Sequence, residues 1–136
     1  MKIIRTRPET QRGPAERFTG EVWLDEIAGA GAPSSRAQAL SVHFTPGART
    51  AWHHHPLGQI LHVTEGQGLV QSVGGPVEAI RAGDTIHFAP DEEHWHGASP
   101  TAFMTHLALQ EADDDGNPAY WGEHVSDAEY LAEPAG

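Results

Sequence analysis

The sequence predicts an all-β protein, a small sandwich or barrel, and three observations support this. Apolar and polar residues alternate along many short segments, which is the period of a half-buried strand. Turn-forming residues, 15 glycines and 10 prolines, separate these segments at short intervals. The chain has 136 residues, enough for one domain with its own hydrophobic core. Regularly spaced short strands joined by such turns are typical of sandwiches and barrels.

The expected elements follow in order along the chain. Residues 1–20 should form an extended or irregular arm, and residues 28–36 have the composition of a loop. Strands are predicted over residues 21–27, 39–45, 50–55, 59–65, 68–73, 77–80, 85–89, 94–98 and 102–110. We therefore expect one domain over residues 1–136, with its barrel core at 37–110 and an acidic C-terminal tail at 111–136.

One short helix is expected in the tail. Ser126 and Glu129 have the spacing of a capping box, in which each residue satisfies a backbone N–H of the other. Tyr130 and Leu131 follow directly and are expected to pack back on the body of the protein. The predicted role of this helix is structural.

Charge and composition exclude several classes of function. The formal net charge is −11, whereas binding to nucleic acid or to an anionic membrane requires a basic surface. Cysteine is absent, which excludes disulfides, cysteine-type zinc sites and thiol nucleophiles. Residues 1–5 carry charges where a signal peptide needs an apolar run, so a soluble, cytoplasmic protein is expected.

Histidines concentrate in two segments of the chain. Because side chains alternate along a strand, His53 and His55 should face one side and His54 the other. The same alternation places His94 and His96 together. Imidazole is the commonest metal ligand, so the two pairs predict the walls of a metal pocket.

Gln59 completes a candidate ligand set with His53, His55 and His94. Two histidines of one strand, an amide after a tight turn and a histidine of a distant strand can converge inside a small barrel. Such neutral ligands leave the charge of the ion uncompensated, which strengthens it as a Lewis acid and lowers the pKa of a bound hydroxyl or water. The alternative is a barrel in which these residues only fill the core and bind no metal.

Further polar residues are expected around the same cavity. His106 and Gln110 share one face of the strand predicted over residues 102–110, and His96 should point inward beside His94. Thr50 can offer a hydroxyl, and two histidines that are not ligands favour proton transfer. Candidates for the apolar wall are Leu40, Val42, Phe44, Trp52 and Phe88, of which some are expected to belong to the ordinary core instead. Histidines expected on the surface or at subunit contacts are His43, His54, His62 and His87.

The spacing of the candidate ligands resembles the first signature of the cupin family. Gly47 is followed by five residues, His53, one residue, His55, three residues, Gln59, six residues and Gly66. The glutamine stands where the family usually has an acidic ligand. The resemblance implies the cupin fold, a small double-stranded β-helix or jelly-roll barrel.

The second signature of that family resembles the segment from Gly83 to His94, in which Pro90 forms part of the turn. Departures from the family pattern are Ala89, Asp91 and Ala98, which stand where the family often has Pro, Gly and Asn. The position of the metal-binding histidine is filled by His94.

Longer segments resemble one subgroup, the bacterial manganese-dependent hydroxynitrile lyases, which are (R)-mandelonitrile lyase-like single-domain cupins. The segments are GPAERFTG (13–20), PGARTAWHHHPLGQ (46–59), HWHGASPTAFMTHLALQE (94–111) and WGEHVSDAEY (121–130). The resemblance implies a metal held by His53, His55, Gln59 and His94, and a reacting cavity lined by Thr50, His96, His106 and Gln110. It also implies a homo-oligomer, a dimer or a tetramer, that acts on a small-molecule substrate.

The implied reaction is the reversible cleavage of a cyanohydrin to an aldehyde and cyanide, with the metal as Lewis acid and His96 or His106 as base. Mn²⁺ is the expected ion, and Fe²⁺, Zn²⁺, Ni²⁺ or Co²⁺ also suit ligands without thiolates. Leu40 is bulkier than the small residue of the subgroup and is expected to narrow the pocket. A cupin oxygenase that uses Fe²⁺, or a non-enzymatic small-molecule-binding cupin, are the alternatives.

Overall fold

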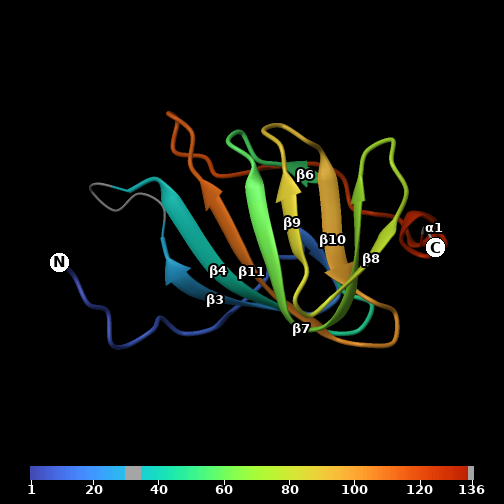
Figure 1. Cartoon of the computed structure of the whole chain (residues 1–136), viewed down its shortest axis with the longest axis horizontal. Coiled ribbons are helices and arrows are strands. Elements are labelled where there is room, and N and C mark those ends of the chain that lie inside the picture. Colours follow the sequence, from blue (N-terminus) through green and yellow to red (C-terminus); the bar gives the residue numbers. More distant parts are fainter. Residues whose placement is uncertain (30–34, 135–136) are drawn as a thin grey trace.

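Twelve antiparallel strands form one continuous sheet that curves over on itself in the computed structural model, which describes residues 1–29 and 35–134 (Figure 1). Most of the expected loop at 28–36 lies outside the described residues. The strands are β1 (Gln11–Arg12), β2 (Phe18–Thr19), β3 (Val22–Ala28), β4 (Ala37–Phe44), β5 (Arg49–Thr50), β6 (His53–His54), β7 (Gln59–Ser72), β8 (Glu78–Arg81), β9 (Thr85–Phe88), β10 (His94–Ala98), β11 (Met104–Glu111) and β12 (Tyr120–Trp121). The main path through the sheet is β1-β3-β4-β11-β7-β10-β5-β2.

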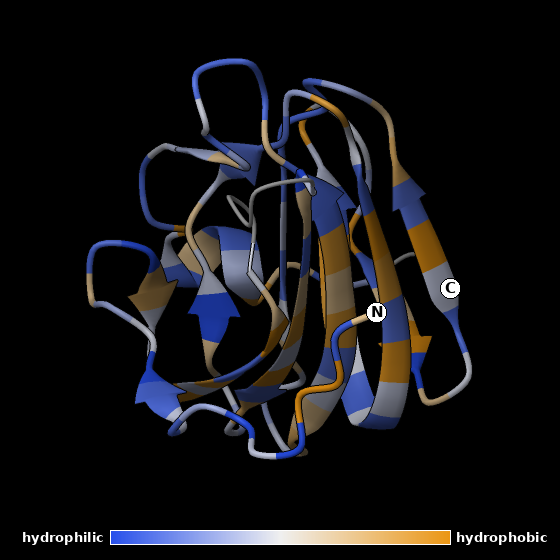
Figure 2. Ribbon diagram, turned by 90° about the vertical axis from the view of Figure 1, so that its left-hand side faces the viewer, coloured by the Kyte–Doolittle hydropathy of each residue, from blue (hydrophilic) through white to orange (hydrophobic). Residues whose placement is uncertain are grey.

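Hydrophobic and hydrophilic residues alternate along the strands of the sheet (Figure 2), and successive side chains of a strand point to opposite faces. The inward-facing side chains form a core between the two layers that includes Val42, Phe44, Leu61 and Met104. Burial of this apolar surface is the main force that closes the two layers. The expected all-β fold is therefore confirmed.

Strand β7 differs from the prediction, because one strand of 14 residues replaces the two expected over 59–65 and 68–73. Its first part pairs with β9 and β11, and its second part pairs with β8 and β10. Gly66 lies at the transition with a φ of 80°, a conformation that favours glycine. Gly66 was expected to end a strand, but it instead bends one that continues to Ser72.

Replacing Gly66 with alanine is expected to lower the free energy of unfolding by roughly 3 kcal/mol, because strain and overpacking add. The new Cβ would collide with the carbonyl oxygen of Phe103. Gly74→Ala is the matched control, since Gly74 has a φ of 78° and no atom within 4 Å of the added Cβ. This control should cost only about 1 kcal/mol. Urea unfolding measures both, and equal losses would contradict the prediction.

The histidine strand predicted over 50–55 is also interrupted. It forms β5 and β6, which pair with opposite ends of β10, and Ala51 and Trp52 lie between them. The predicted alternation nevertheless holds, because His53 and His55 are buried while His54 is only half-buried. The strands β1, β2 and β12 were not predicted, since two residues are too few to show a period.

The predicted helix is confirmed as α1 (Asp127–Tyr130), with both hydrogen bonds of the Ser126–Glu129 capping box in place. The Arg49 guanidinium donates to the carbonyl of Val125 and to the carboxylate of Asp127, each at 2.8 Å, and so fastens the helix to β5. Tyr130 is buried as expected, but the expectation for the next residue was wrong. Leu131 is exposed because the helix ends there and turns its side chain outward.

Within residues 1–29 and 35–134, no helix has the length and apolar character that a membrane span requires.

Candidate metal centre

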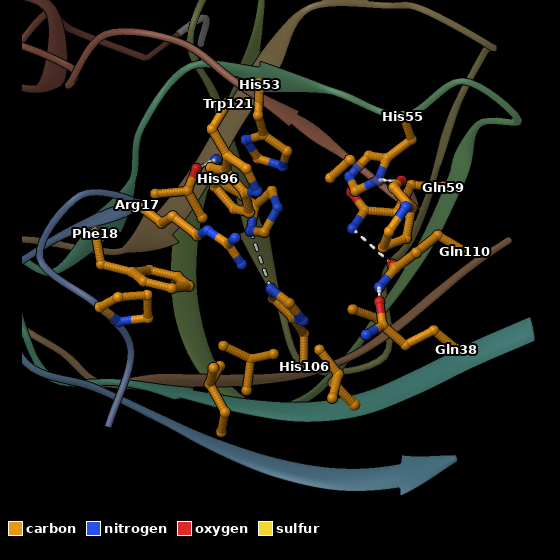
Figure 3. Close-up of a pocket in the computed structure, with 18 of the residues that line it drawn as sticks. Arg17, Phe18, Gln38, His53, His55, Gln59, His96, His106, Gln110 and Trp121 are labelled. Carbon is orange, nitrogen blue, oxygen red and sulfur yellow. Dashed lines mark hydrogen bonds between the residues drawn. The ribbon is translucent and has the colours of Figure 1, made fainter. Parts of the chain in front are cut away.

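The candidate site residues gather around a cavity of about 180 Å³ inside the curved sheet (Figure 3). Seven of the eight predicted residues line it, namely Thr50, His53, His55, Gln59, His96, His106 and Gln110. The eighth residue, His94, lies beside them, with its Nε2 3.0 Å from the Oε1 of Gln59. The cavity is comparable in size to one of about 150 Å³ that accepts benzene in another protein.

The predicted apolar wall is confirmed in part. Leu40 and Val42 line the cavity, whereas Phe44, Trp52 and Phe88 do not. The two phenylalanines belong to the core behind the histidines, and Trp52 packs against a second cluster beneath α1. Trp52 was assigned wrongly, because alternation from His53 places it on the same side as His54, away from the cavity.

Three histidines have the same arrangement of hydrogen bonds. The Nδ1 atoms of His53, His55 and His94 lie 2.8–2.9 Å from the backbone carbonyl oxygens of Ala51, Pro118 and Glu92, respectively. A carbonyl oxygen only accepts, so each Nδ1 carries the hydrogen and each Nε2 keeps its lone pair. Histidines that bind metals are held in this way, with the tautomer set by a partner behind the ring.

The surroundings of His94 test whether these residues fit a cation. Its Nδ1 donates to Glu92, yet its Nε2 lies 3.0 Å from the Gln59 Oε1, which is also an acceptor. A neutral imidazole has one N–H and cannot donate to both oxygens. The Nε2 of His55 is buried without any hydrogen-bond partner among the described residues. A cation beside these lone pairs would satisfy all three atoms, so the donor set fits a metal ion.

His96 also lies close to the candidate ligands. Ring nitrogens of His53, His94 and His96 all lie within 4.8 Å of one another, and this three-histidine cluster is suited to a divalent metal. His96 differs from the other two because its Nδ1 faces the Nε2 of His106 at 3.0 Å and not a backbone carbonyl. Its hydrogen bonding therefore links it to a second imidazole.

The His96–His106 pair is buried and has two free nitrogens. The Nε2 of His96 and the Nδ1 of His106 have no partner among the described residues. Thr50 accepts a hydrogen bond from the backbone N–H of His96 at 3.2 Å, which leaves its own hydroxyl hydrogen free to donate. The two imidazoles can therefore exchange protons with a molecule in the cavity, and Thr50 can donate a hydrogen bond to it.

A chain of side-chain amides extends from the ligand set across the cavity. Gln59 donates to the Oε1 of Gln110 at 3.1 Å, and Gln110 donates to the Oε1 of Gln38 at 2.6 Å. This orientation of the three amides turns the Gln59 oxygen toward His94, as a metal ligand requires. Gln38 was not predicted as a site residue. It lies two residues before Leu40 on β4, so the alternation of side chains places both on the cavity side, and the sequence could have indicated it.

Aromatic rings hold two of the histidines in place. Phe88 stacks on His94 with 3.5 Å between ring centroids, and Trp121 stacks on His53 at 4.4 Å. Trp121 comes from β12, which pairs with β6 and closes one side of the cavity. No signal in the sequence places this tryptophan beside the histidine, because their contact depends on the path of the tail.

Burial lowers the pKa of every histidine in the site below its ordinary value. Burial is the largest cause of the lowered pKa of His94, which falls to about 3, and of His106, which falls to about 4. The pKa values of His53 and His96 are lowered well below 6.5 by burial and then by neighbouring imidazoles. At neutral pH these imidazoles are uncharged, which is the form that binds metals.

Acid is expected to destabilise the protein once metal has been removed with a chelator. In the unfolded chain these histidines have a pKa near 6.5, but in the folded protein the pKa is about 3 for His94 and about 4 for His106. Between these values the unfolded state binds more protons than the folded state. The free energy of unfolding is therefore highest above pH 6.5 and falls as the pH drops from 6.5 through 4 toward 3. Urea unfolding across this range measures the slope.

A variant tests the source of that slope. His106→Gln should reduce it, because glutamine cannot bind the proton that His106 takes up in the unfolded chain. A stability that is constant from neutral pH to the pKa of His106 would contradict the prediction.

The histidines predicted to face away from the cavity do so. His43, His54, His62 and His87 are half-buried or exposed and are absent from the cavity wall. His43 instead bonds the Asp25 carboxylate at 2.8 Å on the outer face of the sheet.

The fold and the site define a β-barrel protein with a buried cluster of three histidines, and residues 40–106 match the cupin domain. The chain belongs to the cupin family. An (R)-mandelonitrile lyase from Granulicella tundricola is 56% identical over 131 residues, which cover 96% of this chain and 98% of that protein.

Solved structures share the same fold. A cupin-like protein from Thermotoga maritima is 36% identical, with a TM-score of 0.83 and 95% of each chain covered. A polyketide cyclase from Streptomyces resistomycificus has a TM-score of 0.72 at 17% identity, with 96% of this chain and 91% of that chain covered. At that identity the similarity concerns the fold alone.

Proposed function

We propose that this chain is a metal-dependent lyase of the hydroxynitrile lyase type, which reversibly cleaves a cyanohydrin to an aldehyde and cyanide. One observation carries the proposal: a set of metal-competent histidines and a separate, hydrogen-bonded histidine pair line the same cavity. The similarity to a protein named (R)-mandelonitrile lyase extends over nearly the whole chain and supports the same conclusion.

The residues that would hold the metal are His53, His55, Gln59 and His94. The three histidines share the backbone-anchored Nδ1 arrangement, and Gln59 directs its oxygen toward His94. The bound ion, for which we propose Mn²⁺, would supply Lewis acidity that lowers the pKa of a substrate hydroxyl.

His96 is assigned as the base, with His106 as its proton reservoir. The two neutral rings share one hydrogen between Nδ1 of His96 and Nε2 of His106. When His96 holds this hydrogen, its Nε2 has a lone pair that can accept the proton of the substrate hydroxyl. His96 can then pass its Nδ1 hydrogen to His106, so the added charge moves away from the reacting atoms.

Cleavage follows from the loss of that hydroxyl proton. The electron pair on the substrate oxygen forms the carbonyl bond of the aldehyde, and the carbon–carbon bond breaks with its electrons on cyanide. Thr50 can donate its free hydroxyl hydrogen to the departing cyanide. The proton held by the histidine pair then converts cyanide to hydrogen cyanide, which balances the reaction.

Anaerobic cleavage of mandelonitrile tests the proposed function. Protein loaded with Mn²⁺ should release benzaldehyde faster than chelator-treated protein, and the rate should not depend on dioxygen. Release at the rate of the chelator-treated control would overturn the proposal. Activity that appears only with dioxygen would indicate an oxygenase instead.

We also propose that the chain assembles as a homo-oligomer. The support is a set of exposed apolar side chains on the outer face of the sheet, Trp23, Ile27, Ile60 and Leu109. Analytical ultracentrifugation measures the assembly, and a monomer at all concentrations would contradict it.

A further inference from the structure

The cavity wall has an unusual charge composition for this protein. Among the described residues that line it, Arg17 is the only arginine or lysine, and none is an aspartate or a glutamate. The chain as a whole has 19 acidic residues and 8 basic ones, so an acid-free cavity does not follow from composition. The one formally charged side chain among the described residues of the cavity wall is therefore positive, although the molecule is strongly negative.

The backbone of Arg17 is held beside this cavity, and the residue is exposed. Its backbone N–H donates to the carbonyl of Pro14 at 3.0 Å, and its carbonyl accepts from the N–H of Ala51 at 2.8 Å. The guanidinium carbon lies 5.4 Å from the centroid of the Trp121 ring, a distance typical of a cation–π contact. Figure 3 shows the guanidinium directed into the cavity.

The guanidinium of Arg17 has no acidic partner in the part of the chain that the structure describes. The ion pairs found there, at distances up to 4.0 Å, involve four other arginines, Arg7, Arg12, Arg36 and Arg49, and the histidines His43 and His54. Its hydrogen-bond donors are thus available to a ligand. A guanidinium fork matches the two oxygens of a carboxylate.

We propose that Arg17 binds the carboxylate of a small-molecule ligand, and that the cavity, besides the uncharged cyanohydrin, takes small carboxylates that also carry a hydroxyl or carbonyl group. The carboxylate would lie at the end of the cavity formed by Arg17 and Trp121, and the hydroxyl would lie at the histidines. The inference rests on the proposed function for the position of the hydroxyl. The carboxylate site itself can be tested without the lyase reaction.

The probes are mandelate and mandelamide, which have nearly the same shape but differ in charge. Chelator-treated protein is used, so that a metal cannot bind the carboxylate. Isothermal titration calorimetry should show that wild-type protein binds mandelate about tenfold more tightly than mandelamide. Arg17→Gln should abolish this preference, and Arg17→Lys should retain part of it because the charge remains without the fork.

Arg12→Gln is the matched control. Arg12 is also an arginine over a tryptophan ring, with its guanidinium carbon 5.9 Å from the centroid of Trp23, but it lies outside the cavity. This variant should keep the full preference for mandelate. A preference that survives in Arg17→Gln, or is absent from the wild-type protein, would overturn the proposal.

The salt dependence of binding is a second test. It uses the wild-type protein alone and therefore does not depend on the folding of a variant. Raising the NaCl concentration should weaken the binding of mandelate and leave that of mandelamide unchanged, because salt screens the charge interaction. The absence of this difference would also overturn the proposal. Mandelonitrile cleavage is scored separately. A lyase without a mandelate preference refutes only the carboxylate site, and a mandelate preference without cleavage refutes only the lyase.

Discussion

Alanine in place of His94 should remove the bound metal and reduce mandelonitrile cleavage by roughly a thousandfold or more. Even the loss of a residue that only hydrogen-bonds to a metal ligand reduces metal affinity or activity by about 10–100-fold. The His94 ring is held by a hydrogen bond to the backbone carbonyl of Glu92 and by the stacked ring of Phe88, and its Nε2 faces the Gln59 oxygen. Metal content is measured by plasma mass spectrometry after dialysis. His62→Ala is the control, because this exposed histidine lies on the outer face.

The same measurement decides between His55 and His96 as the third imidazole ligand. Both rings lie near His53, with centroid separations of 5.0 Å for His55 and 5.2 Å for His96. The hydrogen bonds favour His55, whose Nδ1 is fixed by the carbonyl of Pro118. We expect His55→Ala to lose metal and His96→Ala to retain it. The opposite result would assign the ligand role to His96.

Alanine in place of His106 should reduce kcat by roughly 10²–10⁴-fold while the metal content stays normal, because the loss concerns proton transfer alone. His96→Ala should have an effect of the same order. Since the two rings act through one hydrogen bond, the kcat of the double variant should be only slightly lower than that of the less active single variant. His54→Ala is the control, and it should keep its activity because His54 stacks on Tyr120 away from the cavity.

Two results would contradict this assignment. Full activity in His106→Ala would remove that residue from the mechanism. Losses that multiply in the double variant would show that the histidines act independently, and His106 would then not be the reservoir for the proton that His96 accepts.

Alternation along strands explains why the candidate site could be predicted from the sequence. His106 and Gln110 lie on one face of β11, and His53 and His55 both point inward even though their strand is broken. The period of two residues depends only on local backbone geometry, so it is visible in the sequence. For the same reason His54 was correctly placed on the opposite side.

Contacts made by irregular segments could not be predicted in this way. Arg17 precedes a strand of two residues, and Trp121 belongs to another, so neither segment shows a period. The carbonyl of Pro118 is a backbone atom, and any residue type could supply it to His55. The bend of β7 at Gly66 depends on the close approach of Phe103, which is distant in the sequence.

The anchored Nδ1 atoms and the lowered pKa values of the site have a consequence for the thermodynamics of metal uptake. A flexible site must release protons before its ligands can bind, so its metal affinity changes with pH and its binding enthalpy includes the heat of buffer ionisation. Here His53 and His94 are already neutral and in the ligating tautomer at neutral pH. Calorimetric titration with Mn²⁺ should therefore give the same enthalpy in buffers of different ionisation heat, and a dependence on the buffer would reveal a proton that the site had retained.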